Sequence, residues 1–142
     1  MKPLSKFATS VGIFTIVGPL IGNTAFTLWL TVLDLLESGF ESVLSVLQEF
    51  VFILPYAYSF GVFPACTTGI LFGTIIAKFN LGAIPSVIIG LVVGADTTAL
   101  IFPLPLKGSF AGGDMVWAVS IGAISGAICG LITWRVVGRK AA

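Results

Sequence analysis

The chain has 142 residues, of which 57% are hydrophobic and only 9% are charged. A soluble domain of this size needs many more charged residues to cover its surface, so the composition excludes that class. The formal net charge of +1 gives no basis for binding nucleic acid, and the absence of histidine excludes histidine-ligated haem and histidine general-base catalysis.

Four long stretches with almost no charge predict four transmembrane helices, because about 20 apolar residues are enough to cross a bilayer. We therefore expect an all-α, polytopic membrane protein in which residues 1–142 form a single domain. The lipid bilayer is then its first predicted partner. The predicted spans are residues 11–33, 54–77, 83–102 and 115–134.

The first predicted span contains Gly18 and Gly22 with Pro19 between them, which favours a kink in this helix. Asn23 and Thr24 follow directly. These two polar side chains are expected near the middle of the membrane.

Residues 34–49 form a segment of a different kind, in which apolar residues recur at helical spacing between polar ones. This pattern predicts a short amphipathic helix on the outer membrane surface between the first and second spans. The segment carries four acids and no base, so its acids either face water or form a docking face for a basic partner. The acids are Asp34, Glu37, Glu41 and Glu49.

The second predicted span is interrupted by Pro55 and Pro64 and ends before Lys78. We expect it to be either long and kinked or preceded by an extension of the surface segment. A tight turn leads to the third span, which is closed by Pro103 and Pro105, and a short glycine-rich loop leads to the fourth.

A weak internal repeat accompanies these spans. Gly18 and Gly22 align with Gly90 and Gly94 at an offset of 72 residues, and small residues of the second span align with glycines of the fourth at an offset of 57. The pattern suggests a duplicated two-helix hairpin whose copies run in the same direction. Chance alignment is the alternative, because glycine is abundant throughout the chain.

Small residues recur at every fourth position in three of the spans, so that they lie on one face of each helix. Such small-xxx-small patterns let helix backbones approach closely in lipid. Packing within the bundle, assembly with another chain and lining of a narrow path are three alternatives for these faces. The residues expected in helix packing are Gly18, Gly22, Gly61, Ala65, Gly69, Gly73, Gly90, Gly94, Gly122, Gly126 and Gly130.

Asp96 is the only ionisable side chain well inside a predicted span. An acid at this depth is a candidate proton- or cation-binding group, because leaving it charged in hydrocarbon is costly. Thr97 and Thr98 are adjacent, and Asn23 and Thr24 lie at a comparable depth, so these four residues are candidate members of the same site. The alternative is that the third helix ends early and Asp96 forms local hydrogen bonds near the interface.

Six of the seven basic residues fall on one side of the predicted membrane, which places both termini in the cytoplasm of a bacterial inner membrane. No catalytic motif is present, so we expect neither an enzyme nor a cofactor or metal. The leading hypothesis is a non-enzymatic protein that acts by helix–helix assembly, as a homo-oligomer or with another membrane protein, in the manner of an accessory, regulatory or immunity-type subunit. The alternative is a small oligomeric transporter or channel that uses Asp96.

Overall fold

The computed structural model describes residues 3–38, 43–79, 81–101 and 112–138. Their helices are α1 (Pro3–Ser38), α2 (Val43–Lys78), α3 (Ala83–Ile101) and α4 (Gly112–Thr133), and α4 continues into a π-helical turn, η2 (Trp134–Gly138). Each of the four long helices contains a stretch that is apolar and long enough to cross a membrane. The predicted fold class, an all-α protein with several membrane-spanning helices, is therefore confirmed.

The apolar spans within these helices are Pro3–Trp29, Gly61–Lys78, Ala83–Ile101 and Val116–Val137. A short apolar helical stretch, Phe50–Ser59, lies between the first two and is continuous with α2. The segment expected to form a separate surface helix, residues 34–49, is instead divided between the end of α1 and the start of α2, with residues 39–42 outside the described residues. The helical spacing of its apolar residues is compatible both with a separate helix and with extensions of α1 and α2. Helix α1 ends at Ser38, directly before Gly39, and glycine is unfavourable inside a helix.

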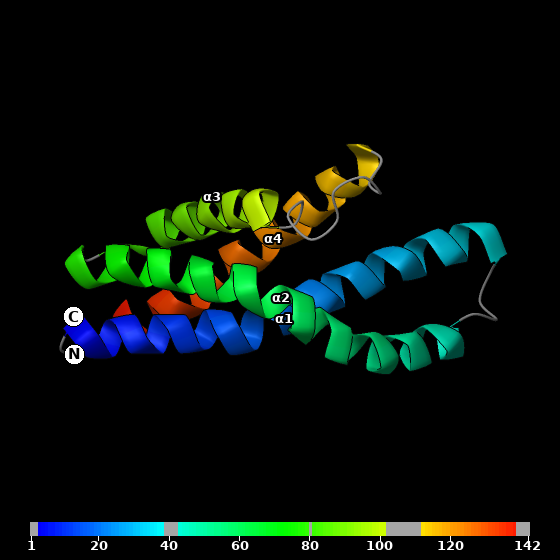
Figure 1. Ribbon diagram of the computed structural model, residues 1–142, viewed down its shortest axis with the longest axis horizontal. Coiled ribbons are helices and arrows are strands. Elements are labelled where there is room, and N and C mark those ends of the chain that lie inside the picture. The colour runs from blue at the N-terminus through cyan, green and yellow to red at the C-terminus, as the bar shows by residue number, and fades with distance from the viewer. Residues whose placement is uncertain (1–2, 39–42, 80, 102–111, 139–142) are drawn as a thin grey trace.

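The helices pair into two hairpins: α1 packs most extensively against α2, and α3 against α4. The two helices of each pair run in opposite directions (Figure 1). Contacts of α1 with α4 and of α2 with α3 join the hairpins into one bundle. Both ends of the chain lie at the same end of this bundle, which we call the terminal end, and the opposite end is the distal end (Figure 1). Helices α1 and α2 have 36 residues each and extend beyond α3 and α4 at the distal end.

The α3–α4 contact is made by glycines on both helices. A Cβ atom on Gly126 would overlap the carbonyl oxygen of Gly90, and one on Gly90 would overlap that of Gly126. One turn further along, a Cβ on Gly122 would lie 2.7 Å from the carbonyl oxygen of Gly94. The two backbones therefore touch directly, as small residues allow in lipid.

The α1–α2 contact also involves small residues, but the atoms nearest to them belong to side chains of the neighbouring helix rather than to its backbone. A Cβ on Gly69 would lie 2.9 Å from Cβ of Phe14, and one on Gly18 would lie 3.3 Å from Cβ of Ala65. The rings of Phe14 and Phe72 pack here with centroids 5.1 Å apart, and Ile76 and Cys129 belong to the same buried cluster. The small-residue series expected to pack are thus in contact with neighbouring helices of the same chain.

The register of the two hairpins differs from the suggested repeat. Gly69 of α2 packs against Val11, whereas Gly126, which lies 57 residues later, packs against Gly90 of α3. Val11 and Gly90 are 79 residues apart, so the offset of 72 for α1 and α3 is not the one that the contacts follow. Seven residues are about two helical turns, which keep the same face, so periodicity alone could not separate the two alignments.

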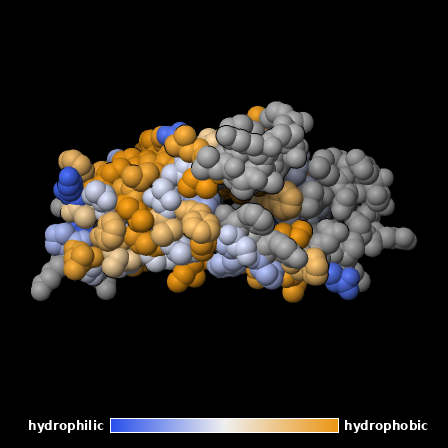
Figure 2. Space-filling model, viewed as in Figure 1, coloured by the Kyte–Doolittle hydropathy of each residue, from blue (hydrophilic) through white to orange (hydrophobic). Residues whose placement is uncertain are grey.

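Most of the surface of these spans faces outward. Only 22–28% of each apolar window is buried within the bundle. Hydrophobic side chains cover much of the described surface in Figure 2, and strongly hydrophilic ones are few: they lie at its two ends and at one place along its upper edge. This distribution is the one that a bilayer requires, so lipid contact is implied for all four helices.

The α3–α4 contact leads to a stability prediction. Gly126→Ala should destabilise the bundle by about 1–3 kcal/mol, because the methyl group cannot fit against the Gly90 backbone. Gly12→Ala is the matched control, since nothing lies within 4 Å of its Cβ position, and it should stabilise α1 by about 0.5–1 kcal/mol. Unfolding by sodium dodecyl sulfate, followed by tryptophan fluorescence, measures both changes. Equal effects of the two substitutions would contradict the described backbone contact.

Candidate functional site

An open cavity of about 710 Å³ lies between the two hairpins, and we call it the inter-hairpin groove. All four helices contribute to it, and the side chains that line it are mostly apolar or small. Its volume falls within the range of about 300–1,000 Å³ that is usual for ligand sites. No charged side chain is among its lining residues.

The groove exists because small residues face it from several helices. Gly22 and Gly61 line it from α1 and α2, and Ala118 and Gly122 line it from α4. The three glycines also pack against neighbours: a Cβ on Gly22 would lie 3.4 Å from Ile121, one on Gly61 would lie 3.5 Å from Pro19, and one on Gly122 would overlap Thr98.

Two tryptophans stand at the distal part of the groove. The rings of Trp29 on α1 and Trp117 on α4 pack with centroids 4.0 Å apart and planes inclined by 31°. Both residues line the groove and are partly exposed. Since tryptophan favours the membrane–water interface, this pair is expected to lie near that level.

Asn23 is the one amide side chain among the residues that line the groove, and only 3% of its surface is exposed. Its Nδ2 donates a long hydrogen bond of 3.5 Å to the carbonyl oxygen of Phe50. Its Oδ1 accepts no hydrogen bond from any described residue. This oxygen has almost no accessible surface, so its missing hydrogen bond is a cost within the bundle.

The hydroxyl groups along the groove already have acceptors. Thr98 donates to the carbonyl oxygen of Gly94, and Ser120 donates to that of Val116. Ser125 donates across the bundle to the carbonyl oxygen of Gly18 at 2.8 Å. These hydroxyls are therefore engaged, and Asn23 Oδ1, which is unpaired, is buried rather than open to the groove.

Two further polar contacts tie the helices together. The hydroxyl oxygens of Thr68 on α2 and Thr97 on α3 are 2.5 Å apart and buried. Tyr58 donates to the carbonyl oxygen of Ile16 at 2.8 Å, close to the Pro19 turn of α1. Sequence reasoning did not single out Thr68, Tyr58 or Ser125. Thr68 and Ser125 each directly precede a glycine of the small-residue series, and this position next to a helix-packing residue could have indicated a polar contact between helices.

The candidate residues of the third span do not point the same way. Asp96 is exposed on the outer surface of α3, whereas Thr97 is buried against α2. Thr98 faces α4, where a Cβ on Gly122 would overlap it. Successive helical residues are about 100° apart, so neighbours in sequence cannot share one face.

The expected polar cluster is brought together only in part. Asn23 and Thr98 both line the inter-hairpin groove, but Asp96 and Thr97 do not. Thr24 is exposed on α1 and donates to the carbonyl oxygen of Leu20 in its own helix. Asp96 forms no hydrogen bond or ion pair with any described residue.

For three of the four acids of the expected docking segment the structure describes the backbone but not the side chain, and the fourth lies outside the described residues. Asp34 and Glu37 belong to the last turns of α1, and Glu49 belongs to the second turn of α2. Glu41 lies outside the described residues. A docking face made by these acids stays a prediction.

The Thr68–Thr97 contact can be tested by a double-mutant cycle. Thr68→Val, Thr97→Val and the double variant should show a coupling of about 0.6–1.7 kcal/mol, the range of hydrogen bonds between helices in membranes. Thr74→Val is the control, because the exposed Thr74 bonds only to the Ile70 carbonyl of its own helix. Detergent unfolding gives the free energies, and zero coupling would contradict a hydrogen bond between α2 and α3.

No group of three or more side chains able to hold a metal ion occurs within the described parts of the chain. No protein-family model, curated protein or solved structure matches the sequence.

Proposed function

We propose that this chain is a small non-enzymatic membrane protein that acts by assembling with another membrane-embedded protein, as an accessory or regulatory subunit. One observation carries the proposal: Asp96 lies on an outward face of α3 that is otherwise apolar.

The outward face of α3 is a ridge of residues spaced four apart. Ile84, Ile88, Val92 and Leu100 are all exposed, and Asp96 occupies the position between Val92 and Leu100. Such spacing places the five side chains in one row along the helix. We call this row the α3 outer face.

A carboxylate on the α3 outer face is unfavourable if lipid covers it. Asp96 lies about 20 Å along the helix from Ala83 and about 8 Å from Ile101, at 1.5 Å per residue. A charged side chain at the centre of a bilayer costs about 3 kcal/mol or more, and such groups usually face protein or water. A partner that supplies a hydrogen-bond donor or a cation at this depth removes the cost.

The small-residue faces give indirect support to this choice of surface. Because Gly69, Gly90 and Gly126 already contact neighbouring helices of the same chain, they are not free for another protein. The α3 outer face is exposed and carries one polar side chain, that of Asp96. Polar residues on such a face act as attachment points between helices in membranes.

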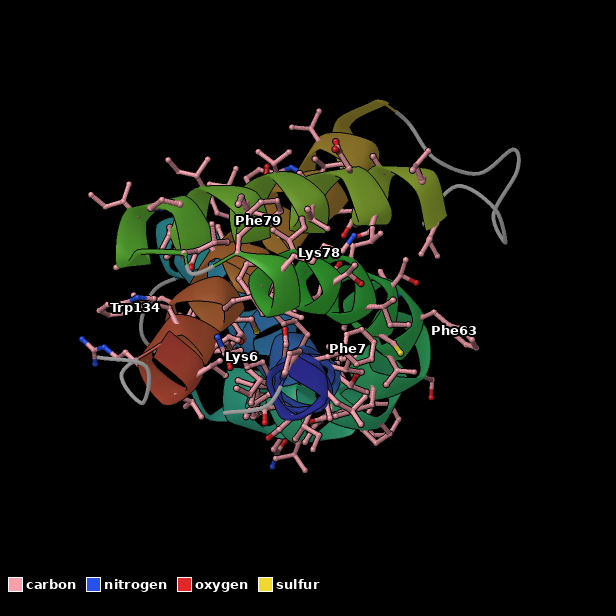
Figure 3. All side chains as sticks on the ribbon, turned by 90° about the vertical axis from the view of Figure 1, so that its left-hand side faces the viewer. Lys6, Phe7, Phe63, Lys78, Phe79 and Trp134 are labelled. Atoms are coloured by element: carbon pink, nitrogen blue, oxygen red, sulfur yellow. The ribbon has the colours of Figure 1, made fainter. Side chains whose placement is uncertain are left out.

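The proposal sets the protein in a bacterial inner membrane with both termini in the cytoplasm. Lys6 and Lys78 lie at the terminal end of the bundle, as the view from that end shows, and Arg135 directly follows Trp134 there (Figure 3). Basic residues favour the cytoplasmic side of a membrane.

Site-specific photocrosslinking in native membranes tests the assembly. A benzoylphenylalanine at position 88 or 100, on either side of Asp96, should give a discrete crosslinked species. Asp96→Leu should lower its yield about 3- to 20-fold, the equivalent of a polar contact between membrane helices.

Two controls sharpen this experiment. The same photoreactive residue at Ile16, which is exposed on α1, should not give the species. Lys107 is the one basic residue on the predicted side opposite the other six, and it lies outside the described residues. Lys107→Gln should leave the yield unchanged, because the proposed partner of Asp96 belongs to another chain. Crosslinking of equal yield from α1 and α3, or yields unaffected by Asp96→Leu, would overturn the proposal.

A transporter or channel that uses Asp96 is the second candidate, favoured by the lack of any described partner for this carboxylate. Asp96→Asn should then abolish pH-dependent ion flux in proteoliposomes, because the amide cannot exchange a proton. Thr67→Val, which changes an exposed polar residue of α2, is the matched control. Absence of flux in the wild-type protein, or flux unchanged by Asp96→Asn, would exclude this role.

A further inference from the structure

We infer that the terminal end of the bundle is a binding surface for anionic phospholipids, whose phosphate groups contact Lys6, Lys78 and Arg135. We call these three residues the basic end. The inference does not depend on the proposed assembly, because Asp96 lies about 20 Å along α3 from the start of that helix at the terminal end.

Three separate elements bring the bases to the terminal end. Lys6 lies near the start of α1, Lys78 is the last residue of α2, and Arg135 belongs to η2 (Figure 3). The sequence has no acid before residue 34, between residues 50 and 95, or after residue 114. The side chains of the segments that form this end therefore include bases but no acids.

A packing contact fixes the relative depth of Lys6 and Lys78. Phe7 of α1 lies against Gly73 of α2, where a Cβ would come within 3.1 Å of its ring. Lys6 directly precedes Phe7, and Lys78 is five residues beyond Gly73, which is about 7.5 Å towards the terminal end. The two lysines are therefore separated by about 6 Å along the bundle.

Arg135 lies at a similar depth. Ser125 of α4 donates to the carbonyl oxygen of Gly18 on α1, so these two residues are level. Arg135 is ten residues beyond Ser125, and Lys6 is twelve residues before Gly18, which correspond to about 15 Å and about 18 Å towards the terminal end. All three bases thus fall within about 9 Å along the bundle, close to the thickness of one headgroup layer.

The basic end lies where a membrane surface is expected. Trp29, of the distal tryptophan pair, is 23 residues from Lys6, which is about 35 Å along α1. A hydrocarbon core is about 30 Å thick, so the bases and the tryptophan pair suit opposite surfaces of one bilayer. Trp134 directly precedes Arg135 and supplies an interfacial aromatic side chain at the basic end.

Each base has an exposed apolar neighbour in the chain. These neighbours are one or two positions away in the sequence, and their side chains are exposed by 44% to 78%. They are Leu4 beside Lys6, Phe79 beside Lys78 and Val136 beside Arg135. A ligand that fits this surface must offer negative charge to the bases and hydrocarbon to their neighbours.

Anionic phospholipids have both properties. Their phosphate oxygens accept charge-assisted hydrogen bonds from ammonium and guanidinium groups, and their acyl chains cover apolar side chains. Phosphatidylcholine offers the same phosphate and chains, but its own cationic group cancels the negative charge. Inorganic phosphate has the charge but leaves the apolar neighbours exposed to water.

Trp134 can report which lipid lies at the basic end. The purified full-length protein is placed in phosphatidylcholine nanodiscs that contain a small fixed fraction of brominated phosphatidylglycerol or brominated phosphatidylcholine. Both lipids carry bromine at the same chain position near the headgroup, and bromine quenches tryptophan fluorescence at contact. Trp134→Phe retains the Trp29 and Trp117 pair, so its difference from the wild-type protein gives the signal of Trp134.

We expect the quenching of Trp134 to show a preference of about 5-fold for phosphatidylglycerol, the factor that one base near an anionic surface contributes. In about 0.5 M sodium chloride the preference should decline towards one, because salt screens exposed charges. Lys78→Gln/Arg135→Gln, which changes two exposed side chains, should lower it below about 2-fold. Lys107→Gln is the charge-matched control from the predicted opposite side and should leave it unchanged.

Equal quenching of Trp134 by the two brominated lipids overturns the inference, and this result needs no variant of the bases. A preference that survives Lys78→Gln/Arg135→Gln also overturns it, since other groups would then hold the lipid. Inorganic phosphate is added to the nanodiscs as a last comparison. If it removes the preference more effectively than sodium chloride of the same ionic strength, the bases select free phosphate and the lipid assignment is wrong.

Discussion

The close approach of the α3 and α4 backbones is the constraint on which the rest of the structure depends. In lipid, apolar side chains gain nothing by leaving their surroundings, so helices associate through close packing and hydrogen bonds. Gly90 and Gly126 meet with so little space that a single methyl group on either would overlap the other backbone. Helices α1 and α2 pack against this second hairpin through contacts such as the hydrogen bond from Ser125 to the Gly18 carbonyl oxygen and the contact of Thr68 with Thr97.

Small residues have two consequences in this bundle, and their position decides which one applies. Between α3 and α4 they bring two backbones into contact. Between the hairpins, Gly22, Gly61 and Ala118 line the inter-hairpin groove, and the two glycines also lie against side chains of Ile121 and Pro19. The core of Phe14, Phe72 and Cys129 lies next to this groove, which separates a packed region from an open one within a single bundle.

The polar residues of the spans are divided between the inside and the outside of the bundle. Thr97 and Thr98 are held by contacts with α2 and α4, while Asp96, their neighbour in sequence, lies outside. Asn23 lines the groove and Asp96 belongs to the α3 outer face, so the two side chains serve different surfaces. Successive residues of a helix point about 100° apart, so Asp96, Thr97 and Thr98 do not share one face and a single polar cluster does not form.

Hydropathy and charge determined the number of spanning helices, because the need to satisfy every backbone group in lipid leaves few alternatives to an apolar helix. Four-residue spacing also identified which glycines would face another helix. It could not identify which helix they would face, or the register, since a shift of two turns keeps the same face. The direction of Asp96, the Thr68–Thr97 contact and the groove were decided by the tertiary structure alone, because each depends on how two hairpins distant in sequence are placed against each other.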